Sequence, residues 1–186
     1  MLEAMAPVER TDAQVVRDVL AGDRDSYRLL VRRYGDVLHG HALRMAGSPD
    51  EAAELVQRAL VQGFKKLHTC REPERAGAWL FRILANLCKD HVRSPRRRDV
   101  PLAAVASALP SDADPASDAA DAEIRARVWS ALDALTPEQR EAFVLKHVEG
   151  RSYEEIAAVM DLSVASLKMR VHRAREALRG LLEEYA

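Results

Sequence analysis

An acidic, proline-containing stretch divides this chain into two parts. Between Asp99 and Ile124 the sequence has no lysine or arginine. Its charged residues are all acidic and prolines interrupt it: Asp99, Asp112, Asp114, Asp118, Asp121 and Glu123, with Pro101, Pro110 and Pro115. Such a composition is typical of a solvated tether rather than a packed element. We therefore expect an N-terminal domain at residues 8–98, a flexible acidic linker at 99–122 and a C-terminal domain at 123–186.

Both flanking parts have the composition of helical domains. Hydrophobic residues make up 48% of the chain, which is enough to fill a core, whereas aromatic residues make up only 5%. No convincing run alternates β-branched with polar residues, as a half-buried strand would. We expect an all-α fold of two small helical domains.

Capping residues mark several helix starts. Ser48 and Thr136 each stand before a proline, which suits the first position of a helix, and Glu51 is placed to close a capping box at Ser48. The helix after Ser48 carries apolar residues at helical spacing: Ala53, Val56, Leu60, Phe64 and Leu67. We expect the helix after Thr136 to run to about Glu149, with Gly150 in the left-handed conformation that ends many helices.

Two further caps predict a helix-turn-helix at the C-terminal end. Ser152 with Glu155 can cap a helix that reaches Met160. Asp161-Leu162 then make a short turn, and Ser163 can cap a long final helix. This order of helix, tight turn and helix is the one that DNA-binding helix-turn-helix motifs use.

The final helix has an apolar face and a basic, exposed face. Its apolar residues recur at spacings of three and four, so they must be buried: Val164, Leu167, Val171, Ala174, Leu178 and Leu181. At about 100° per residue, the opposite face is centred on Ala165, Met169, His172 and Glu176. Ser166 and Arg173 lie beside this centre, and the margins are basic, with Lys168, Arg170, Arg175 and Arg179.

Such a helix suits the DNA major groove, where its centre touches base edges and its margins neutralise phosphates. The alternative is that these charges only solvate a surface helix. The capped helix and the short turn before it favour DNA binding.

Two phrases in this region carry a resemblance to a known family. They are Glu149-Gly150 before Ser152-Tyr153-Glu154-Glu155-Ile156-Ala157, and His172-Arg173-Ala174-Arg175 on the final helix. Together with the surrounding residues 134–182, they resemble the promoter-reading domain of bacterial sigma factors of the sigma-70 family, in particular the extracytoplasmic-function group. The resemblance implies that the final helix binds the minus-thirty-five element of a promoter, through Ser166, Lys168, Met169, Arg170, His172, Arg173 and Arg175.

Residues 12–98 resemble the same group. The opening pattern is Leu20, Gly22, Asp23, Tyr27, Leu30 and Tyr34, and Glu54-Leu55-Val56-Gln57 stands where the polymerase-binding helix of the family lies. The resemblance implies that Glu54, Gln57 and Arg58 contact core RNA polymerase. With Val61 and Lys65 they project away from the apolar stripe, as a docking face would. Without the resemblance, an ordinary solvated helix face would explain this pattern as well.

Trp79-Leu80-Phe81-Arg82-Ile83 and Ala85-Asn86-Leu87 resemble the helix that grips the minus-ten element. The resemblance implies that Asn86 and the polar loop at 68–77 hold a base flipped from the melted non-template strand. Flipping costs a few kcal/mol, which a pocket must offset. Trp79 is either a core residue, which we favour, or a platform for stacking. The basic run Arg93, Arg96, Arg97 and Arg98 suits phosphates by charge and reach.

Several positions depart from the family pattern. Arg58 stands where an acidic residue is common, which bears on polymerase docking. Asp161 replaces the usual glycine of the turn, although aspartate tolerates the left-handed conformation better than most residues. Ala165, Ser166 and Met169 stand where glycine, threonine and serine are frequent in the family. The resemblance therefore does not determine which promoter sequence the final helix prefers.

The resemblance implies three partners: core RNA polymerase, promoter DNA as a duplex and as a melted non-template strand, and an anti-sigma protein. Two other functions stay open, a stand-alone DNA-binding regulator and an interaction protein that does not bind DNA. The sequence has no phosphate loop or nucleophile motif, so we expect no enzyme. His68 and Cys70 could form half of a metal site, but no second pair completes it, and we expect neither a metal nor a cofactor.

The chain has no apolar run near the roughly 20 residues that span a bilayer and no signal peptide. We therefore expect a cytoplasmic protein without membrane insertion. In that reducing compartment its two cysteines, Cys70 and Cys88, are expected to be free thiols.

Overall fold

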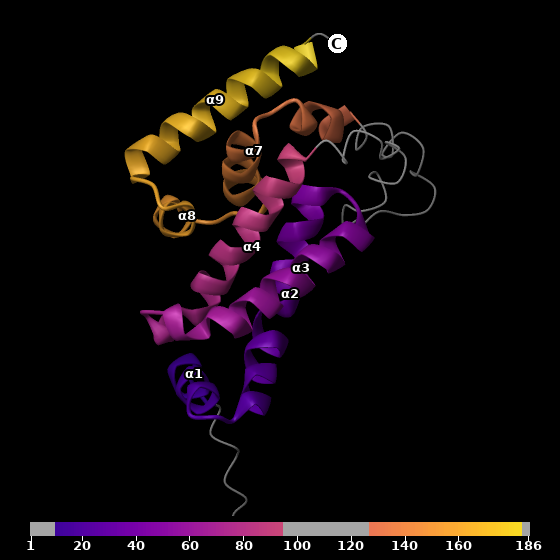
Figure 1. The fold of residues 1–186 in the computed structure, drawn as a ribbon. Coiled ribbons are helices and arrows are strands. Elements are labelled where there is room, and N and C mark those ends of the chain that lie inside the picture. The colour runs from indigo at the N-terminus through magenta and orange to yellow at the C-terminus, as the bar shows by residue number, and fades with distance from the viewer. Residues whose placement is uncertain (1–9, 95–126, 184–186) are drawn as a thin grey trace, which may run out of the picture.

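The computed structural model of the chain describes residues 10–94 and 127–183 (Figure 1). Within these residues, every regular element is a helix. The N-terminal half contains α1 (Asp12–Leu20), α2 (Tyr27–Ala46), α3 (Pro49–Lys66) and α4 (Ala76–Arg93), with short 3-10 turns at Arg24–Ser26, Leu67–Thr69 and Pro73–Arg75. The C-terminal half contains a helical stretch at 127–133, then α7 (Pro137–Phe143), α8 (Tyr153–Met160) and α9 (Val164–Glu183). The expected all-α fold is confirmed. None of these helices combines the length and the apolar character needed to cross a membrane.

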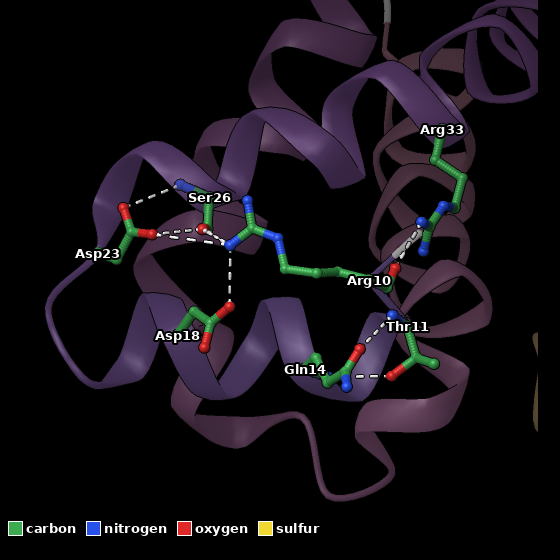
Figure 2. Close-up of polar contacts among 7 residues, drawn as sticks. All are labelled: Arg10, Thr11, Gln14, Asp18, Asp23, Ser26 and Arg33. Carbon is green, nitrogen blue, oxygen red and sulfur yellow. Dashed lines mark hydrogen bonds and ion pairs between the residues drawn. The ribbon is translucent and has the colours of Figure 1, made fainter. Parts of the chain in front are cut away.

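Arg10 ties the start of the chain to the turn between α1 and α2. Its guanidinium donates to Asp18 Oδ2 at 3.0 Å and to Ser26 Oγ at 2.7 Å (Figure 2). Asp23 caps the turn, because its carboxylate accepts from both the backbone N–H and the hydroxyl of Ser26. Asp23, a residue of the opening pattern, therefore has a structural role here, because it caps the turn from which α2 begins.

The predicted caps are present, with one difference. Capping boxes form at Thr136 and Ser152, and Ser163 Oγ accepts from the N–H of Ser166 at 3.1 Å at the start of α9. Ser48 also caps α3. The carboxylate of Glu51, however, lies 3.2 Å from His91 Nε2 on α4 instead of closing a box, so it joins α3 to α4.

The buried face of α3 differs from the predicted stripe. Its buried residues are Ala52, Leu55, Val56, Ala59 and Gly63, whereas Ala53 and Phe64 are exposed. The reason is the close approach of neighbouring helices. A Cβ on Gly63 would lie 2.4 Å from Leu80 Cδ2 and 2.7 Å from the Tyr27 hydroxyl. Gly63 is therefore buried here because no larger residue fits against Leu80 and Tyr27.

The helix after Thr136 widens before it ends. Val144–Val148 form a π-helical turn, and the N–H of Glu149 donates to the carbonyl of Val144 at 2.9 Å. Gly150 then adopts φ 67°, as predicted, and Asp161 adopts φ 54° after α8. A π turn inserts one extra residue into the helix and shifts the side chains that follow it.

Both halves of the chain contribute to one hydrophobic core. The largest buried cluster contains Phe81, Leu84 and Cys88 of α4 together with Leu145, Ile156 and Leu167 of the C-terminal half. Figure 1 shows α7 and α8 against α4, with α9 crossing above α7. A smaller cluster joins α1 to α2 and α4, and another joins 131–135 to α9. Residues 99–122, the predicted linker, lie outside the described residues.

The two cysteines are buried free thiols in different places. Cys70 lies in the loop before α4 and Cys88 lies inside α4. Burial raises the pKa of the Cys88 thiol to about 12. At neutral pH this thiol is protonated and behaves as a small core side chain.

Candidate nucleic-acid interface

The final helix presents the predicted face to solvent. Leu167, Val171, Ala174 and Leu178 are buried, and Val164 and Leu181 are half-buried. The exposed residues include Ala165, Ser166, Lys168, Met169, His172, Arg173 and Arg175, while Arg170 is half-buried. Seven side chains expected to bind DNA therefore share this one helix, and six of them are exposed.

The first turn of α9 combines a capped helix start with an exposed apolar side chain. The Ser163 hydroxyl donates to Ser166 Oγ at 2.9 Å, so Ser166 is held by the cap. The positive end of a helix dipole favours nearby phosphate oxygens. Met169 is 53% exposed, which leaves its side chain free to contact an apolar group such as the methyl of thymine.

Positive charge surrounds this helix. Burial and the charges of Arg175 and Lys146 lower the pKa of His147, because the imidazolium form is disfavoured near other cations. Lys168 Nζ lies 5.6 Å from the ring centroid of Tyr153 on α8. Further along, Arg179 pairs with Glu176 at 3.1 Å, and both are well exposed. The arrangement is suited to a polyanion at the start and middle of α9.

A second candidate surface lies on α4. A pocket of about 470 Å³ lies between the loop at 69–72 and α4, where Arg75, Ala78, Trp79 and Arg82 line it. Trp79 is half-buried and packs against the N-terminal core, and it also lines this pocket. The two roles considered for Trp79 are therefore compatible. Asn86 is exposed one turn beyond Arg82 on the same helix face.

The basic run after α4 is only partly described. Arg93 pairs with Glu138 of α7 and lies 3.6 Å from Asp90, so its guanidinium is engaged within the protein. Arg96 and Arg97, both expected to bind DNA, lie outside the described residues, as does Arg98.

The exposed face of α3 carries more apolar surface than the sequence pattern predicts. Glu54, Gln57, Arg58, Val61 and Lys65 are all exposed, and Arg58 pairs with Glu54 at 3.8 Å. Phe64 is 37% exposed and Val61 48% exposed, and with Gln57 they follow the spacing of one helix face. The i, i+4, i+7 spacing of Gln57, Val61 and Phe64 indicates this shared face, whereas the predicted apolar stripe places Phe64 in the core.

Comparison with known proteins decides the family. The model of sigma-70 region 2 matches residues 30–98, and that of sigma-70 region 4 matches residues 125–178. The chain is 32% identical to the ECF RNA polymerase sigma-E factor of Escherichia coli K12, over 90% of this chain and 92% of the relative. The chain belongs to the sigma-70 family, in its ECF group. It is also 35% identical to the ECF RNA polymerase sigma factor SigE of Mycolicibacterium smegmatis, of whose length it spans 63%.

Solved structures agree with this assignment. The structure of CnrH in complex with the cytosolic domain of CnrY matches with a TM-score of 0.65 and 30% identity, covering 94% of this chain and 99% of that one. The sigma factor RpoE of Bartonella quintana, in complex with the anti-sigma factor NepR, matches with a TM-score of 0.57 and 27% identity, covering 84% and 96%. The region 4 match contains α8 and most of α9, and the region 2 match contains α3 and α4.

Proposed function

We propose that this sigma factor binds core RNA polymerase through α3, reads the minus-thirty-five element with α9 and holds the melted minus-ten element at α4. The observation that carries the proposal is the exposed face of α9. It joins basic and hydrogen-bonding side chains on a helix whose opposite face is buried, within a match to sigma-70 region 4. The protein acts as an initiation factor and not as an enzyme, and it works in the cytoplasm with the polymerase.

At the minus-thirty-five element, the centre of α9 reads bases. His172 and Arg173 offer donors to base edges, and Met169 offers an apolar contact. Lys168, Arg170 and Arg175 lie toward the margins of the same face and neutralise phosphates, with Ser166 at the start of the helix. Base contacts set the preference and phosphate contacts set most of the affinity.

At the minus-ten element, the pocket beside Trp79 receives a flipped base of the non-template strand. Its volume of about 470 Å³ lies within the range of small-ligand pockets. Trp79 offers a face for stacking, Asn86 offers an amide for base recognition, and Arg96 and Arg97 follow with charge for the strand backbone.

On α3, the docking face consists of Glu54, Gln57 and Arg58 with the apolar side chains of Val61 and Phe64. An apolar centre with a polar rim is the usual make-up of a protein interface. In keeping with this division of labour, residues 8–98 form the domain for polymerase and the minus-ten element, and 123–186 form the domain for the minus-thirty-five element. The acidic linker at 99–122 passes through the polymerase between them.

An anti-sigma protein is the third partner of this scheme. The solved relative RpoE is in complex with the anti-sigma factor NepR. In this chain a groove of about 570 Å³ runs between α2, α4 and α8, with Tyr34, Val37 and Phe81 among its lining residues. Val37 is 52% exposed, so this groove presents an accessible apolar side chain to a partner. We assign this groove to the anti-sigma protein.

Run-off transcription with core RNA polymerase tests the function. Transcripts that depend on the chain and on one promoter class support it. Tight, sequence-specific binding to duplex DNA without polymerase would instead favour a stand-alone regulator. Failure to bind either DNA or polymerase would favour an interaction protein.

A further inference from the structure

The first two turns of α9 expose an apolar strip at the centre of their outer face. Ala165 and Met169 are exposed one turn apart on this face, and Met169 is 53% exposed. Neither side chain carries a hydrogen-bond donor, and the thioether of methionine is only a weak acceptor. The strip can therefore contact a base through apolar groups, but it cannot read a hydrogen-bonding edge.

The polar neighbours of this strip are engaged elsewhere. On one side, the hydroxyl of Ser163 donates to Ser166 Oγ at 2.9 Å, which holds the Ser166 side chain toward the start of the helix. On the other side, Lys168 Nζ lies 5.6 Å from the ring centroid of Tyr153 on α8, within the range of a cation–π contact. The ammonium group of Lys168 is thus drawn toward α8 and away from the centre of the face.

Tyr153 provides a fixed support for this lysine. Its ring packs against the main hydrophobic core, and Lys146 Nζ lies 4.7 Å from the ring centroid. Lys146 in turn donates to the carbonyl of Arg151 at 3.1 Å. Because the ring is held on several sides, its contact with Lys168 favours one position of that lysine at the margin of the face, where phosphates lie.

Hydrogen-bonding side chains reach the centre of the face only further along the helix. His172 and Arg173 are exposed about one turn beyond Met169. In the major groove, purines and cytosine are recognised by their donors and acceptors, whereas thymine also presents a 5-methyl group that apolar side chains contact. This methyl group is therefore the base feature that the strip is suited to select.

We propose that Ala165 and Met169 select a 5-methylpyrimidine in the minus-thirty-five element by its methyl group, so that thymine and 5-methylcytosine are equivalent there. The two bases carry the methyl group on the same ring atom and differ at C4, where thymine has an acceptor oxygen and cytosine a donor amine. Since the strip has no group that reads the C4 edge, it does not distinguish them. Methylation of a cytosine at this position therefore strengthens promoter binding. This inference rests on the proposed function, because it takes α9 as the helix that reads the element.

Selection with polymerase identifies the position that is read. The full chain, assembled with core RNA polymerase, is mixed with a duplex pool randomised across both promoter elements, and the bound duplexes are sequenced. The selected minus-thirty-five element should contain thymine. At each of its thymines, duplexes with thymine, uracil, cytosine or 5-methylcytosine are then compared, each with the matching purine opposite. This set varies the methyl group and the C4 edge independently.

At one position, thymine and 5-methylcytosine should bind alike, and uracil and cytosine about fourfold more weakly, as expected for the loss of one buried methyl group. Met169→Ser should bind all these duplexes nearly alike, because it removes most of the apolar strip. Met169→Leu keeps an apolar side chain of similar size and should retain the preference. The control is Leu20→Ser, since Leu20 is 55% exposed on α1 and outside the proposed contact surfaces. This variant should keep the wild-type affinity and preference.

Three results would overturn this inference and leave the proposed function intact. The first is uracil binding as tightly as thymine at every position of the element. The second is a difference between thymine and 5-methylcytosine, at the methyl-dependent position, that exceeds the effect of the methyl group. The third is a methyl preference that persists in Met169→Ser. If the assembled polymerase selects no promoter from the pool, the proposed function fails and this inference fails with it.

Discussion

The carboxylate of Glu149 lies 2.7 Å from the ring of His41, although the two residues are 108 positions apart along the chain. Burial alone would raise the pKa of Glu149. The hydrogen bond with His41 and the charges of His41, Arg44 and Arg151 outweigh burial, and the pKa is below the ordinary value. In the same interface, burial raises the pKa of Glu141 despite its ion pair with Lys89. The two carboxylates should therefore respond to pH in opposite directions.

Glu149 should stabilise the protein less as the pH falls. A carboxylate whose pKa is lowered by folding contributes stability above its unfolded value, and this contribution is lost as the pH falls through the folded pKa. The wild type should exceed Glu149→Gln in free energy of unfolding at pH 7, and the difference should shrink below pH 4.5, the ordinary glutamate value. Urea unfolding from pH 7 to pH 3 measures it. A difference that is constant with pH would contradict the lowered pKa.

Glu141 should show the reverse dependence. A carboxyl whose pKa is raised by folding favours the folded state in its protonated form, so its relative contribution grows as the pH falls through the folded pKa. The free energy of unfolding of the wild type minus that of Glu141→Gln should therefore increase as the pH is lowered from 7 toward 4.5. The same urea series checks the sign, and Glu138→Gln, at a more exposed position on α7, is the control. If the difference between the wild type and Glu141→Gln instead decreased as the pH was lowered, the Lys89 charge would outweigh burial in setting the pKa of Glu141.

The C-terminal helices could be predicted from the sequence because their signals are local. The buried stripe of α9, the caps at Ser152 and Ser163 and the left-handed Asp161 all depend on residues within a few positions of one another. Helical periodicity and capping are properties of such short segments. The exposed face of α9 followed from the same periodicity.

The interface between the N-terminal and C-terminal halves could not be predicted in this way. His41, Glu141 and Glu149 are charged or polar residues within helical patterns, where such residues usually face solvent. Their burial depends on partners on other helices, in the opposite half of the chain. The exposure of Phe64 was missed for a related reason, since the small residues Ala59 and Gly63 are buried by close helix packing that the apolar pattern does not encode.

Gln57→Ala should weaken binding to core polymerase without affecting the fold. Gln57 is exposed on α3, and its truncation removes no buried contact. Binding to core polymerase should fall at least several-fold in a pull-down or anisotropy titration, while the melting temperature stays within about 2 °C, as is usual for surface changes. Arg58→Glu, which restores the commoner family residue, should bind equally or more tightly. Unfolding of Gln57→Ala would show that this side chain is structural.

Gly77→Ala should destabilise the start of α4. A Cβ at this position would lie 2.3 Å from Tyr34 Cε1, and the hydroxyl of that ring donates to Asp12. Overpacking of this kind costs about 1–3 kcal/mol. Gly35→Ala is the matched control, because its Cβ would meet nothing within 4 Å and an α-helix prefers alanine by about 0.5–1 kcal/mol. In thermal unfolding, Gly77→Ala should lower the melting temperature and Gly35→Ala should raise it. Equal changes in melting temperature would contradict the close contact with Tyr34.

Arg173→Ala and Arg179→Ala should separate base reading from phosphate binding on α9. Arg173 lies beside the centre of the exposed face, so its loss should cost about 1–3 kcal/mol on the preferred promoter and relax the preference at one or two base pairs. Arg179 lies further along the helix, where it pairs with Glu176 at 3.1 Å. Its loss should weaken all sequences about equally and lower the salt dependence by about one phosphate contact. Binding with polymerase across single-base promoter variants at two salt concentrations measures both effects. Equal, sequence-independent losses would mean that α9 does not read bases through the face on which Arg173 lies.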